Sequence, residues 1–348
     1  MNGEAFDVAI IGGGPAGCAA ALTLLRYSKL RVVVIERSDY EGWRVGETLS
    51  PGVRPLLRYL DATSILEDDG HLTNYGTAAS WGSDDTVSRD FLFVAAGEGR
   101  HLDRARFDRS LAQLVRERGG TVMTGHTYES ANAAARYVID ASGRHASFAR
   151  SRGARVIAHD NLMGIVAIVA SAHGYDGGTL VEAVPDGWWY SARLPGNRAV
   201  VAFMSDADII REQKLHEKPE LLRQLASSHA TRARIGDAEI LHGPTACPAQ
   251  SQILDKPYGD GWIAAGEAAI AFDPLSSMGI GYAITSGIEA ARVAASSLNG
   301  GDGAPAYAAD VAAHFQSYLA RKREYYAIEQ RWRDRPFWAR RHGRLPEP

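Results

Sequence analysis

Cysteine is scarce in this sequence, and its scarcity excludes two kinds of site. The chain holds two cysteines, Cys18 and Cys247, and no CxxC motif. Cys18 follows a glycine-rich turn in a stretch that should form a buried helix, so we expect no disulfide with Cys247. Two isolated thiols are typical of a reducing compartment and do not form a zinc site. We therefore expect a cytoplasmic protein without a bound metal.

The sequence also lacks a strong excess of charge of either sign. Its 348 residues carry a formal net charge of −3, and the pI is about 6.4. Proteins that bind nucleic acid are usually strongly basic, so this balance predicts neither a nucleic-acid nor a membrane partner. The first seven residues contain no basic segment, and we expect no signal peptide.

A single long apolar run, over residues 8–25, could be taken for a membrane span. Gly-Gly-Gly-Pro interrupts this run, and its first residues are β-branched. This pattern favours a buried strand, a turn and a helix over a membrane span.

The N-terminal part of the chain predicts a parallel sheet. Residues 7–11 and 31–36 are typical of buried strands, and a helix is expected between them over 16–26. The spacing of apolar residues predicts a further helix over 104–118. Short strands are expected at 121–123, 137–139 and 262–265.

The middle of the chain predicts a different architecture. Short β-like runs at 165–169, 179–184, 188–194 and 199–204 are separated by turn residues, which indicates an antiparallel sheet. A long helix is expected over 281–298, and after a loop a helical stretch over 306–339.

These elements and the chain length predict an α/β protein with two interlocked domains and a helical C-terminus. One is a doubly wound, Rossmann-like nucleotide-binding domain, and the other is an antiparallel β-sheet substrate domain. The predicted boundaries are 1–73, 100–150 and 255–300 for the first domain, 74–99 and 151–254 for the second, and 301–348 for the C-terminal segment.

The strongest functional signal is a glycine motif that follows the first strand and opens the first helix. It comprises Gly12, Gly14, Pro15, Ala16 and Gly17. Gly12 permits a tight turn, Gly14 lets backbone N–H groups approach a pyrophosphate, and Gly17 lets the helix pack closely on the strand. The N-terminus of the helix then attracts the phosphate anion.

An acidic residue at the end of the second strand completes the motif. Glu36 lies about twenty residues beyond the glycines and is placed to accept hydrogen bonds from the ribose of the adenosine. Arg37, next to it, is a further candidate for cofactor binding. The motif predicts a dinucleotide site but does not by itself choose between NAD and FAD.

Residues 261–281 resemble the second flavin signature of the para-hydroxybenzoate hydroxylase superfamily. The resemblance implies FAD, with the acid on the ribityl chain and the following helix N-terminus at the pyrimidine edge of the flavin. The residues that it places at the cofactor are Gly266, Glu267, Pro274, Gly279 and Ile280. The usual acid is aspartate, so the longer side chain of Glu267 departs from the family pattern.

Three further segments extend this resemblance. Residues 44–51, beginning with Arg44, look like the loop that crosses near the isoalloxazine. Residues 101–108 look like the family's arginine-containing helix start, from which Arg104 or Arg106 would meet the FAD phosphates. Residues 140–144 look like the strand end beside the cofactor.

From about residue 7 to 341 the sequence is most similar to the halogenase-like group of the superfamily. Within that group it resembles the flavoproteins that oxygenate tryptophan during quinone-cofactor maturation, as in lysine and glycine oxidases and quinohemoprotein amine dehydrogenase. The resemblance implies an FAD-dependent monooxygenase that hydroxylates an aromatic small molecule, or tryptophan in a peptide or protein, through a flavin C4a-hydroperoxide. Its co-substrate is O2, and a second GxGxxG is absent, so electrons come from transiently bound NAD(P)H or a separate flavin reductase.

Three alternatives remain open on sequence. A flavin-dependent halogenase requires a lysine between the Gly-Glu loop and the aromatic strand, but no lysine lies between Lys29 and Lys214, and the WxWxIP signature is absent. A reductase of the geranylgeranyl reductase type also carries similar loops. A protein that binds FAD and a partner without turnover is the third alternative.

The catalytic residues are less clearly marked than the cofactor site. The candidates are Glu47, Trp189 and Met278, with Glu182 and His71 as further candidates for a general base. Because side chains alternate along a strand, either Trp189 or the pair Trp188 and Tyr190 faces the pocket. The arginine- and tryptophan-rich C-terminal segment is either a lid or docking helix for an acidic peptide, or a solvated amphipathic helix packed on the nucleotide-binding domain.

Overall fold

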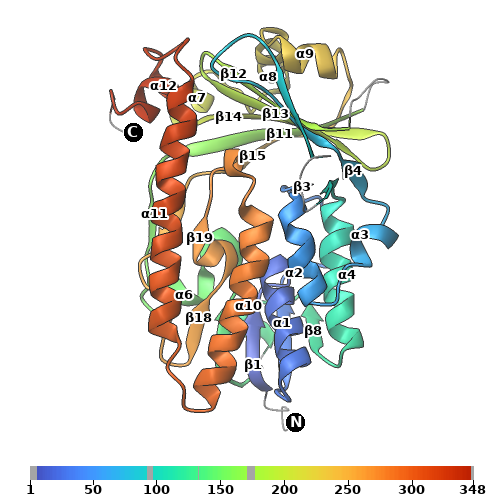
Figure 1. Ribbon diagram of the computed structural model, residues 1–348, viewed down its shortest axis with the longest axis vertical. Helices are drawn as coiled ribbons and strands as arrows, with labels where there is room; N and C mark the ends of the chain where they lie inside the picture. Colours follow the sequence, from blue (N-terminus) through green and yellow to red (C-terminus); the bar gives the residue numbers. More distant parts are fainter. Residues whose placement is uncertain (1–5, 92–96, 132, 171–176, 346–348) are drawn as a thin grey trace.

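The computed structural model describes residues 6–91, 97–131, 133–170 and 177–345. The expectation of no signal peptide concerns residues that lie outside these described ranges. Residues 1 and 348, the outer ends of the predicted domains, also lie outside them. Two large sheets lie one above the other, and the long helix α11 (Ala304–Ile328) runs beside both of them (Figure 1). The fold is the predicted α/β architecture with a Rossmann-like half, a second sheet and C-terminal helices.

The lower sheet has six strands in the order β17-β18-β9-β1-β2-β8. Every neighbouring pair is parallel except β17–β18. The strands are β17 (Tyr258–Gly259), β18 (Trp262–Ala264), β9 (Ala135–Asp140), β1 (Phe6–Ile11), β2 (Val32–Glu36) and β8 (Thr121–Thr124). The predicted β-turn-α-β unit is therefore confirmed, and it places the carboxyl ends of β1, β2 and β9 at one edge, where ligands of open α/β sheets bind.

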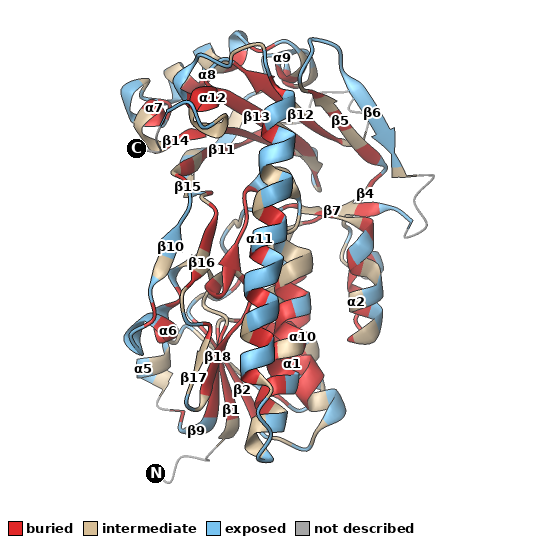
Figure 2. Cartoon of the chain, turned by 60° about the vertical axis from the view of Figure 1, so that its left-hand side comes forward, coloured by how far each residue is buried: buried red, intermediate tan, exposed pale blue. Residues whose placement is uncertain are grey.

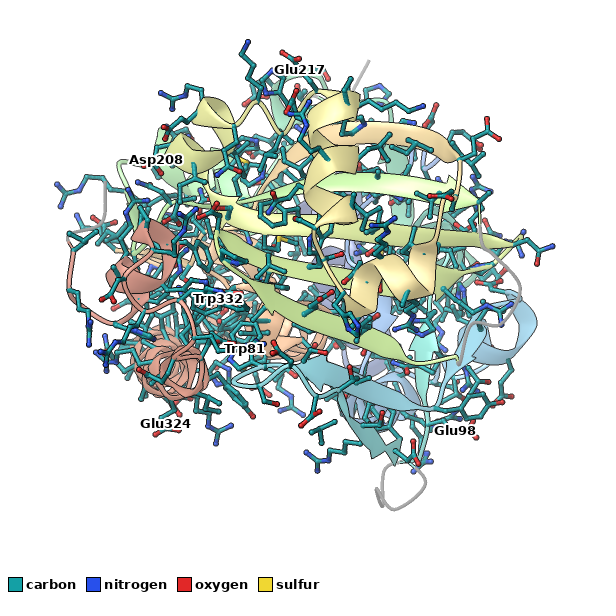
Figure 3. The ribbon with its side chains drawn as sticks, turned by 90° about the horizontal axis from the view of Figure 1, so that it is seen from above. Trp81, Glu98, Asp208, Glu217, Glu324 and Trp332 are labelled. Atoms are coloured by element: carbon teal, nitrogen blue, oxygen red, sulfur yellow. The ribbon has the colours of Figure 1, made fainter. Side chains whose placement is uncertain are left out.

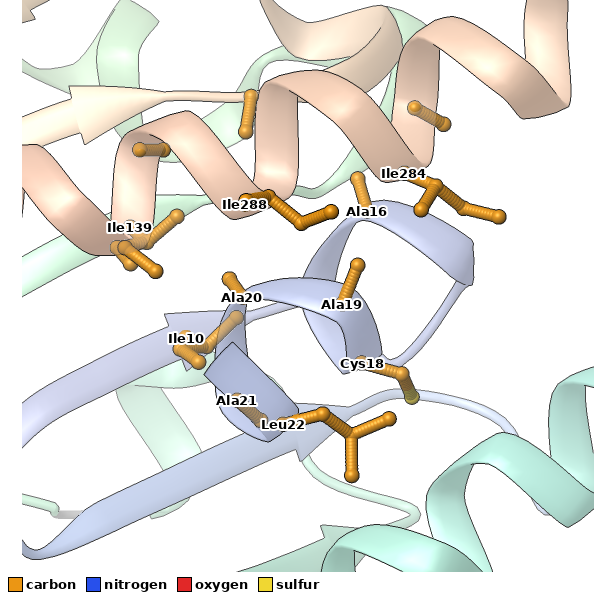
Figure 4. Close-up of a cluster of buried hydrophobic side chains, with 14 of the residues drawn as sticks. Ile10, Ala16, Cys18, Ala19, Ala20, Ala21, Leu22, Ile139, Ile284 and Ile288 are labelled. Atoms are coloured by element: carbon orange, nitrogen blue, oxygen red, sulfur yellow. The ribbon is translucent and has the colours of Figure 1, made fainter. Parts of the chain in front are cut away.

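Three helices cover one face of this sheet: α1 (Pro15–Tyr27), α4 (Arg104–Glu117) and α10 (Gly279–Leu298). Figure 4 shows Ile284 and Ile288 of α10 above Ala16 and Ala20 of α1. The two helices can cross closely because Gly287 has no side chain. A Cβ atom at that position would lie 2.2 Å from the carbonyl oxygen of Ala16. Small residues on α1 and a glycine on α10 thus bring both helix N-termini to the same end of the sheet.

The upper sheet has seven strands in the order β15-β11-β14-β13-β12-β5-β6. It is antiparallel except for the parallel pair β12–β5. The strands are β15 (Ile240–Pro248), β11 (Leu162–Ala170), β14 (Arg198–Asp206), β13 (Gly187–Leu194), β12 (Thr179–Val184), β5 (Gly76–Ser80) and β6 (Val87–Asp90). The outer face is covered by α7 (Ala207–Glu212), α8 (Lys218–Ala226) and α9 (Ala230–Ile235).

Shorter elements connect the two large sheets. One small sheet contains β3 (Thr48–Leu49), β7 (Gly99–His101) and β4 (Leu72–Asn74), and another contains β10 (Val156–Ala158), β16 (Gln252–Leu254) and β19 (Ile270–Ala271). The remaining short elements are the helices α2 (Arg54–Tyr59), α3 (Ile65–Asp68), α5 (Tyr128–Ala131) and α6 (Ser147–Ser151), and the 3₁₀ turns η1 (Pro51–Val53), η3 (Gly143–His145), η4 (Gly266–Ala268) and η5 (Pro274–Ser276). Strand β16 pairs with β10 on one side and with β19 on the other, so this sheet crosses the predicted boundary at residue 255. The division into domains stays a prediction.

The C-terminal stretch is not the single helical segment predicted over 306–339. It forms α11 and, after a break, α12 (Pro336–Arg341). The helix ends where Glu329 turns to an extended conformation and accepts the backbone N–H of Gly82 at 2.8 Å. Pro336 then starts the second helix, since proline is favoured in the first turn.

The packing of this segment confirms the second interpretation for α11 and corrects it for α12. The lower part of α11 packs on the nucleotide-binding half through Tyr307 and Phe315, and Phe337 and Trp338 of α12 are fully buried against the inner face of the upper sheet. Viewed in Figure 2, α11 shows exposed residues outward along its length. The segment is a bridge between the two halves because its aromatic residues are buried on both. No helix in the described part of the chain is long and apolar enough to cross a membrane.

Candidate functional site

The glycine turn lies between β1 and α1 and leaves room above its backbone. Gly12 has a φ of +103°, and a Cβ atom there would lie 2.2 Å from the carbonyl oxygen of Ala141, so only glycine fits. A Cβ atom on Gly17 would lie 1.9 Å from the carbonyl oxygen of Gly12. A Cβ atom on Gly14, in contrast, would meet nothing within 4 Å. Gly14 therefore borders open space at the N-terminus of α1, which has no side-chain cap.

Glu36, at the end of β2, is held tightly beside this turn. Its Oε2 accepts the N–H of Gly13 at 2.7 Å, and its Oε1 accepts the N–H and hydroxyl of Ser38 at 3.0 and 2.6 Å. Burial raises the pKa of this carboxyl, but these hydrogen bonds and the charge of Arg44 outweigh burial and leave the pKa lowered. Glu36 is therefore an anionic acceptor at the position predicted for a ribose.

Two arginines converge next to Glu36 on one buried carboxylate. Arg44 places one guanidinium nitrogen 3.3 Å from Glu36 and another 3.0 Å from Asp108. Arg104 pairs with Asp108 at 3.2 Å and donates to the carbonyls of Val45 and Gly46 at 2.6 and 3.1 Å. Asp108 itself is fully buried. The structure thus brings two cations to the edge of the glycine turn, where a pyrophosphate would need them.

The structure separates the two arginines that the sequence left as alternatives. Arg106 is exposed and donates to the carbonyl of Asp69 at 2.7 Å, so it does not join the cluster of Arg44, Arg104 and Asp108. Residues two apart on a helix do not share a face, which is why only one of the two can reach the site. Arg37 is also exposed, and its side chain is no part of this cluster.

The second flavin segment lies directly against the glycine motif. Gly266 donates its N–H to Ser286 of α10 at 2.8 Å, and a Cβ atom on Gly266 would lie 2.7 Å from that of Ala16. Glu267 is half-exposed and forms an ion pair with Arg144 at 3.2 Å. Glu267 and Arg144 therefore meet from the two segments that were expected beside the cofactor.

The turn that leads into α10 forms the next wall of the site. Pro274 and Gly279 are exposed, and Met278 and Ile280 are half-buried. Helix α10 begins at Gly279 without a side-chain cap. Its N-terminus thus carries free backbone N–H groups and the positive end of the helix dipole, which suits a ligand that gains negative charge.

Glu47 is an unusual carboxyl in the loop after Arg44. Its side chain is buried, its Oε2 accepts the N–H of Gly46 at 3.1 Å, and its Oε1 has no hydrogen-bond partner among the residues that the structure describes. Burial raises the pKa of Glu47 to about 7. A buried carboxyl poised between its two charge states is suited to hold or transfer a proton.

The aromatic strand β13 presents Tyr190 to this loop. The Tyr190 hydroxyl lies 2.6 Å from the hydroxyl of Thr48, which in turn lies 3.3 Å from Nδ1 of the buried His101. Of the two alternatives left open for this strand, the pair Trp188 and Tyr190 faces inward, and the choice of Trp189 as a catalytic candidate is wrong. Trp189 lies on the other face of the sheet, where it packs on Phe203 with ring centroids 5.0 Å apart and belongs to the core under α8 and α9. The alternation of side chains sends Tyr190, not Trp189, to the inner face.

The two further candidates for a general base have structural partners. Glu182 accepts the N–H groups of His229, Ala230 and Thr231 at the start of α9, at 2.7, 3.0 and 2.6 Å. The Nδ1 atom of His71 accepts the N–H of Asp103 at 3.2 Å, next to the start of α4. Both side chains are therefore used for local structure.

Sequence reasoning missed several residues of the site. Asp108 could have been found, because it lies four residues after Arg104 on a helix, where opposite charges meet. Ser38 gave no specific signal. The hydroxyl of Tyr40 donates to the carbonyl of Gly13 at 3.0 Å, and only the folded loop reveals this contact.

The residues present fit FAD. The cradle above Gly14, the acceptor Glu36, the two paired arginines and two uncapped helix N-termini supply what a pyrophosphate, a ribose and a flavin ring require. The unpartnered Oε1 of Glu47 lies in the loop expected near the flavin ring.

Comparisons with known proteins point to the same chemistry. A family model described as FAD dependent oxidoreductase matches residues 7–68. The chain is 34% identical over 362 residues to LodB of Marinomonas mediterranea, named as an FAD-dependent oxidoreductase, with 98% of each chain covered.

Two solved structures share the fold. The myxobacterial chondrochloren halogenase CndH is 21% identical, with 97% of this chain and 86% of that chain covered and a TM-score of 0.86. The peptidyl tryptophan dihydroxylase QhpG is 23% identical, with 97% and 79% covered and a TM-score of 0.73. On the identity and coverage shared with LodB, the chain belongs to the FAD-dependent oxidoreductases.

Proposed function

We propose that this protein is an FAD-dependent monooxygenase that hydroxylates an aromatic side chain, with tryptophan in a peptide or protein as the preferred substrate class. The observation that carries the proposal is the buried, half-paired carboxyl of Glu47 between the cofactor cradle and the inner face of the aromatic strand. Bound FAD, once reduced, supplies the two electrons that activate O2. One oxygen atom enters the aromatic ring and the other leaves as water.

The residues of this chain act on protons and on position. Glu47, with its pKa near 7, holds a proton where one must be delivered to the departing oxygen or taken from the substrate ring. The hydroxyl of Tyr190 and that of Thr48 form a polar edge next to it. Arg104 and Glu36 bind the pyrophosphate and the ribose, and the α10 N-terminus favours the negative charge of the reduced cofactor.

The choice of substrate rests on similarity. The sequence resembles tryptophan-oxygenating flavoproteins, and QhpG, described as a peptidyl tryptophan dihydroxylase essential for tryptophylquinone cofactor biogenesis, shares the fold. The sequence carries one dinucleotide motif, which the FAD would occupy. The electrons would therefore come either from transiently bound NAD(P)H or from a separate flavin reductase.

The test uses chemically reduced enzyme, so that the electron donor does not matter. FAD-loaded protein is reduced with dithionite without air and mixed with buffer that contains ¹⁸O2 and a short tryptophan-containing peptide. Mass spectrometry should show one ¹⁸O atom in the peptide. The control is Gly14→Val, which should fold because the site of its side chain is open, and should bind no FAD because the pyrophosphate needs that space.

Unmodified peptide after complete reoxidation of the flavin, with free tryptophan unmodified as well, would contradict the proposal. A second set of reactions contains chloride or bromide and free tryptophan. We expect no halotryptophan, because the sequence has no lysine between Lys29 and Lys214, the stretch in which a halogenase carries one. Its appearance would identify a halogenase instead.

A further inference from the structure

A buried network connects the long helix α11 to the turn in front of α10. Lys322 and Tyr326 lie four residues apart on α11 and therefore on one face of it. The Tyr326 hydroxyl donates to Oδ2 of Asp273 at 2.8 Å, and the Lys322 ammonium lies 3.8 Å from the same atom. Neither the cofactor motifs nor the aromatic strand predicted these contacts.

Asp273 fixes the turn that follows it. Its Oδ1 accepts the N–H of Leu275 at 2.9 Å, and its carbonyl accepts the hydroxyl of Ser276 at 2.8 Å. Its own N–H donates to the hydroxyl of Tyr318, also on α11, at 2.8 Å. Asp273 is 1% exposed, so water does not compete for these hydrogen bonds. The position of Pro274–Ser276, and of Met278 after it, thus depends on how Asp273 is held.

One cation serves two buried carboxylates in this network. Lys322 pairs with Asp160, donates to the Ser251 hydroxyl at 2.9 Å and faces Asp273. Burial raises the pKa of Asp273, and the charge of Lys322 opposes that effect. Burial also raises the pKa of Asp160, but the charge and hydrogen bond of Lys322, together with Ser251 and Arg341, outweigh burial and leave that pKa lowered. Without the ammonium group the wall of the site would carry uncompensated negative charge.

The network also extends to the upper sheet. The indole N–H of Trp188 donates to the Tyr326 hydroxyl at 3.0 Å, while that hydroxyl donates to Asp273. Around them lies a cluster of aromatic rings, and Figure 3 shows two of them, Trp81 and Trp332, beside the upper end of α11. The turn is therefore connected through one hydroxyl to the strand that carries Tyr190.

We infer that Lys322 and Tyr326 are positioning residues for the cofactor: through Asp273 they hold the Pro274–Met278 turn against the flavin, and the charge of Lys322 favours its reduced form. The inference rests on the placement of the flavin ring at the α10 N-terminus, and not on the identity of the substrate. A fixed positive charge stabilises a cofactor that becomes more negative on reduction, so it raises the reduction potential.

The experiment measures the midpoint potential and the dissociation constant of FAD in purified holoprotein variants. Lys322→Met should lower the potential, and Lys322→Arg should restore it toward the wild-type value. Tyr326→Phe removes one hydroxyl and keeps the ring, and it should weaken FAD binding about three- to tenfold. Lys218→Met, at an exposed lysine on α8, should leave both quantities unchanged.

An unchanged potential in folded Lys322→Met would overturn the inference, as would a potential in Lys322→Arg as low as that in Lys322→Met. If Lys322→Met fails to fold, Tyr326→Phe decides: weaker FAD binding supports the inference, and unchanged FAD binding and potential contradict it. Both readouts are independent of turnover. If the variants show the expected changes in potential and FAD affinity but the wild type does not hydroxylate the peptide, the proposed function is rejected and this inference stands.

Discussion

Near the C-terminus, Arg340 and Arg341 both donate hydrogen bonds to one buried carboxylate, that of Asp206. Asp206 is fully buried at the end of β14 and accepts from Arg340 at 2.7 Å and from Arg341 at 2.7 and 2.6 Å. Arg340 also forms two hydrogen bonds with Asp208, at 2.9 and 2.6 Å. At the glycine turn, Arg44 and Arg104 share Asp108 in a similar way, but this cluster borders open space at Gly14 and an unpartnered oxygen of Glu47.

The difference lies in what completes each cluster. The C-terminal arginines have their partners within the chain, and α12 is held to the sheet by them. The guanidinium groups of Arg44 and Arg104 are also paired within the chain, with Glu36, Asp108 and the carbonyls of Val45 and Gly46, but they lie in the segments where we expect the cofactor. Similar residue types therefore occur in a structural cluster and in an expected binding site, and only the surroundings distinguish the two.

The largest effect should follow from breaking the C-terminal cluster. Asp206→Ala leaves two arginines without their shared buried partner and should lower the free energy of unfolding by about 3–5 kcal/mol, measured by urea denaturation. Asp208→Ala is the matched control, since that side chain is 42% exposed, and should cost less than about 1 kcal/mol. Equal effects of the two variants would show that the buried carboxylate is not what holds α12.

A pH-dependent effect is expected at Glu47. Because its pKa is raised from 4.5 to about 7 in the folded chain, the folded state binds more protons than the unfolded state between these values. The stability contribution of Glu47 is thus present below pH 4.5 and lost as the pH rises through 7. Glu47→Gln should gain stability over the wild type between pH 5 and 8, up to about 3 kcal/mol.

Urea denaturation at several pH values in the absence of FAD measures this gain. Glu41→Gln is the control, because the Glu41 side chain is 71% exposed, and its difference from the wild type should not grow with pH. A difference for Glu47→Gln that stays constant over this range would mean that the Glu47 carboxyl is better solvated than its burial indicates.

A smaller effect, confined to the cofactor, is expected from Arg104→Gln. Loss of the guanidinium should weaken FAD binding about ten- to hundredfold, the usual value of a hydrogen bond to a charged group. Arg106→Gln, two residues along the same helix and exposed, should bind FAD like the wild type. Titration of the apoprotein with FAD, followed by fluorescence, measures both, and weaker binding by the Arg106 variant would reverse our assignment.

The smallest effect should come from the acid that departs from the family pattern. Glu267→Asp restores the usual residue but shortens the reach to Arg144. The Glu267 side chain is 42% exposed, so its ion pair with Arg144 is partly solvated. We expect FAD affinity to change by less than about fivefold and stability by less than about 1 kcal/mol. A larger loss of FAD affinity would show that this protein has adapted its ribityl contacts to glutamate.

Local sequence was sufficient where a motif is contiguous. The strand, turn and helix around Gly12, and Glu36 at the next strand end, follow from buried runs and glycine spacing that any chain must satisfy to bind a pyrophosphate. Four strands of the upper sheet, β11, β12, β13 and β14, were also predicted from their short runs and turns, whereas β15, β5 and β6 were not. The parallel pairing of β5 with β12 was not, because it joins segments about a hundred residues apart in sequence.

Side-chain direction and long-range partners were less accessible. The sequence left the choice between Trp189 and Tyr190 open, and the sheet decided it by packing one face under α8 and α9. It also gave no partner for Lys322, which lies 162 residues from Asp160. The break before Pro336 depended on Glu329 reaching the backbone of Gly82, again a distant segment.

By itself, then, the sequence determined the nucleotide-binding unit, because that unit depends on backbone conformations and residue spacings within a few dozen residues. The choice of FAD over NAD came from the resemblance of residues 261–281 to a known flavin signature. Tertiary structure decided which arginine reaches the site, which aromatic residue faces it and how the C-terminal helices bridge the two halves. These choices depend on which buried charges and rings find complementary partners, and such partners come together only when distant segments pack.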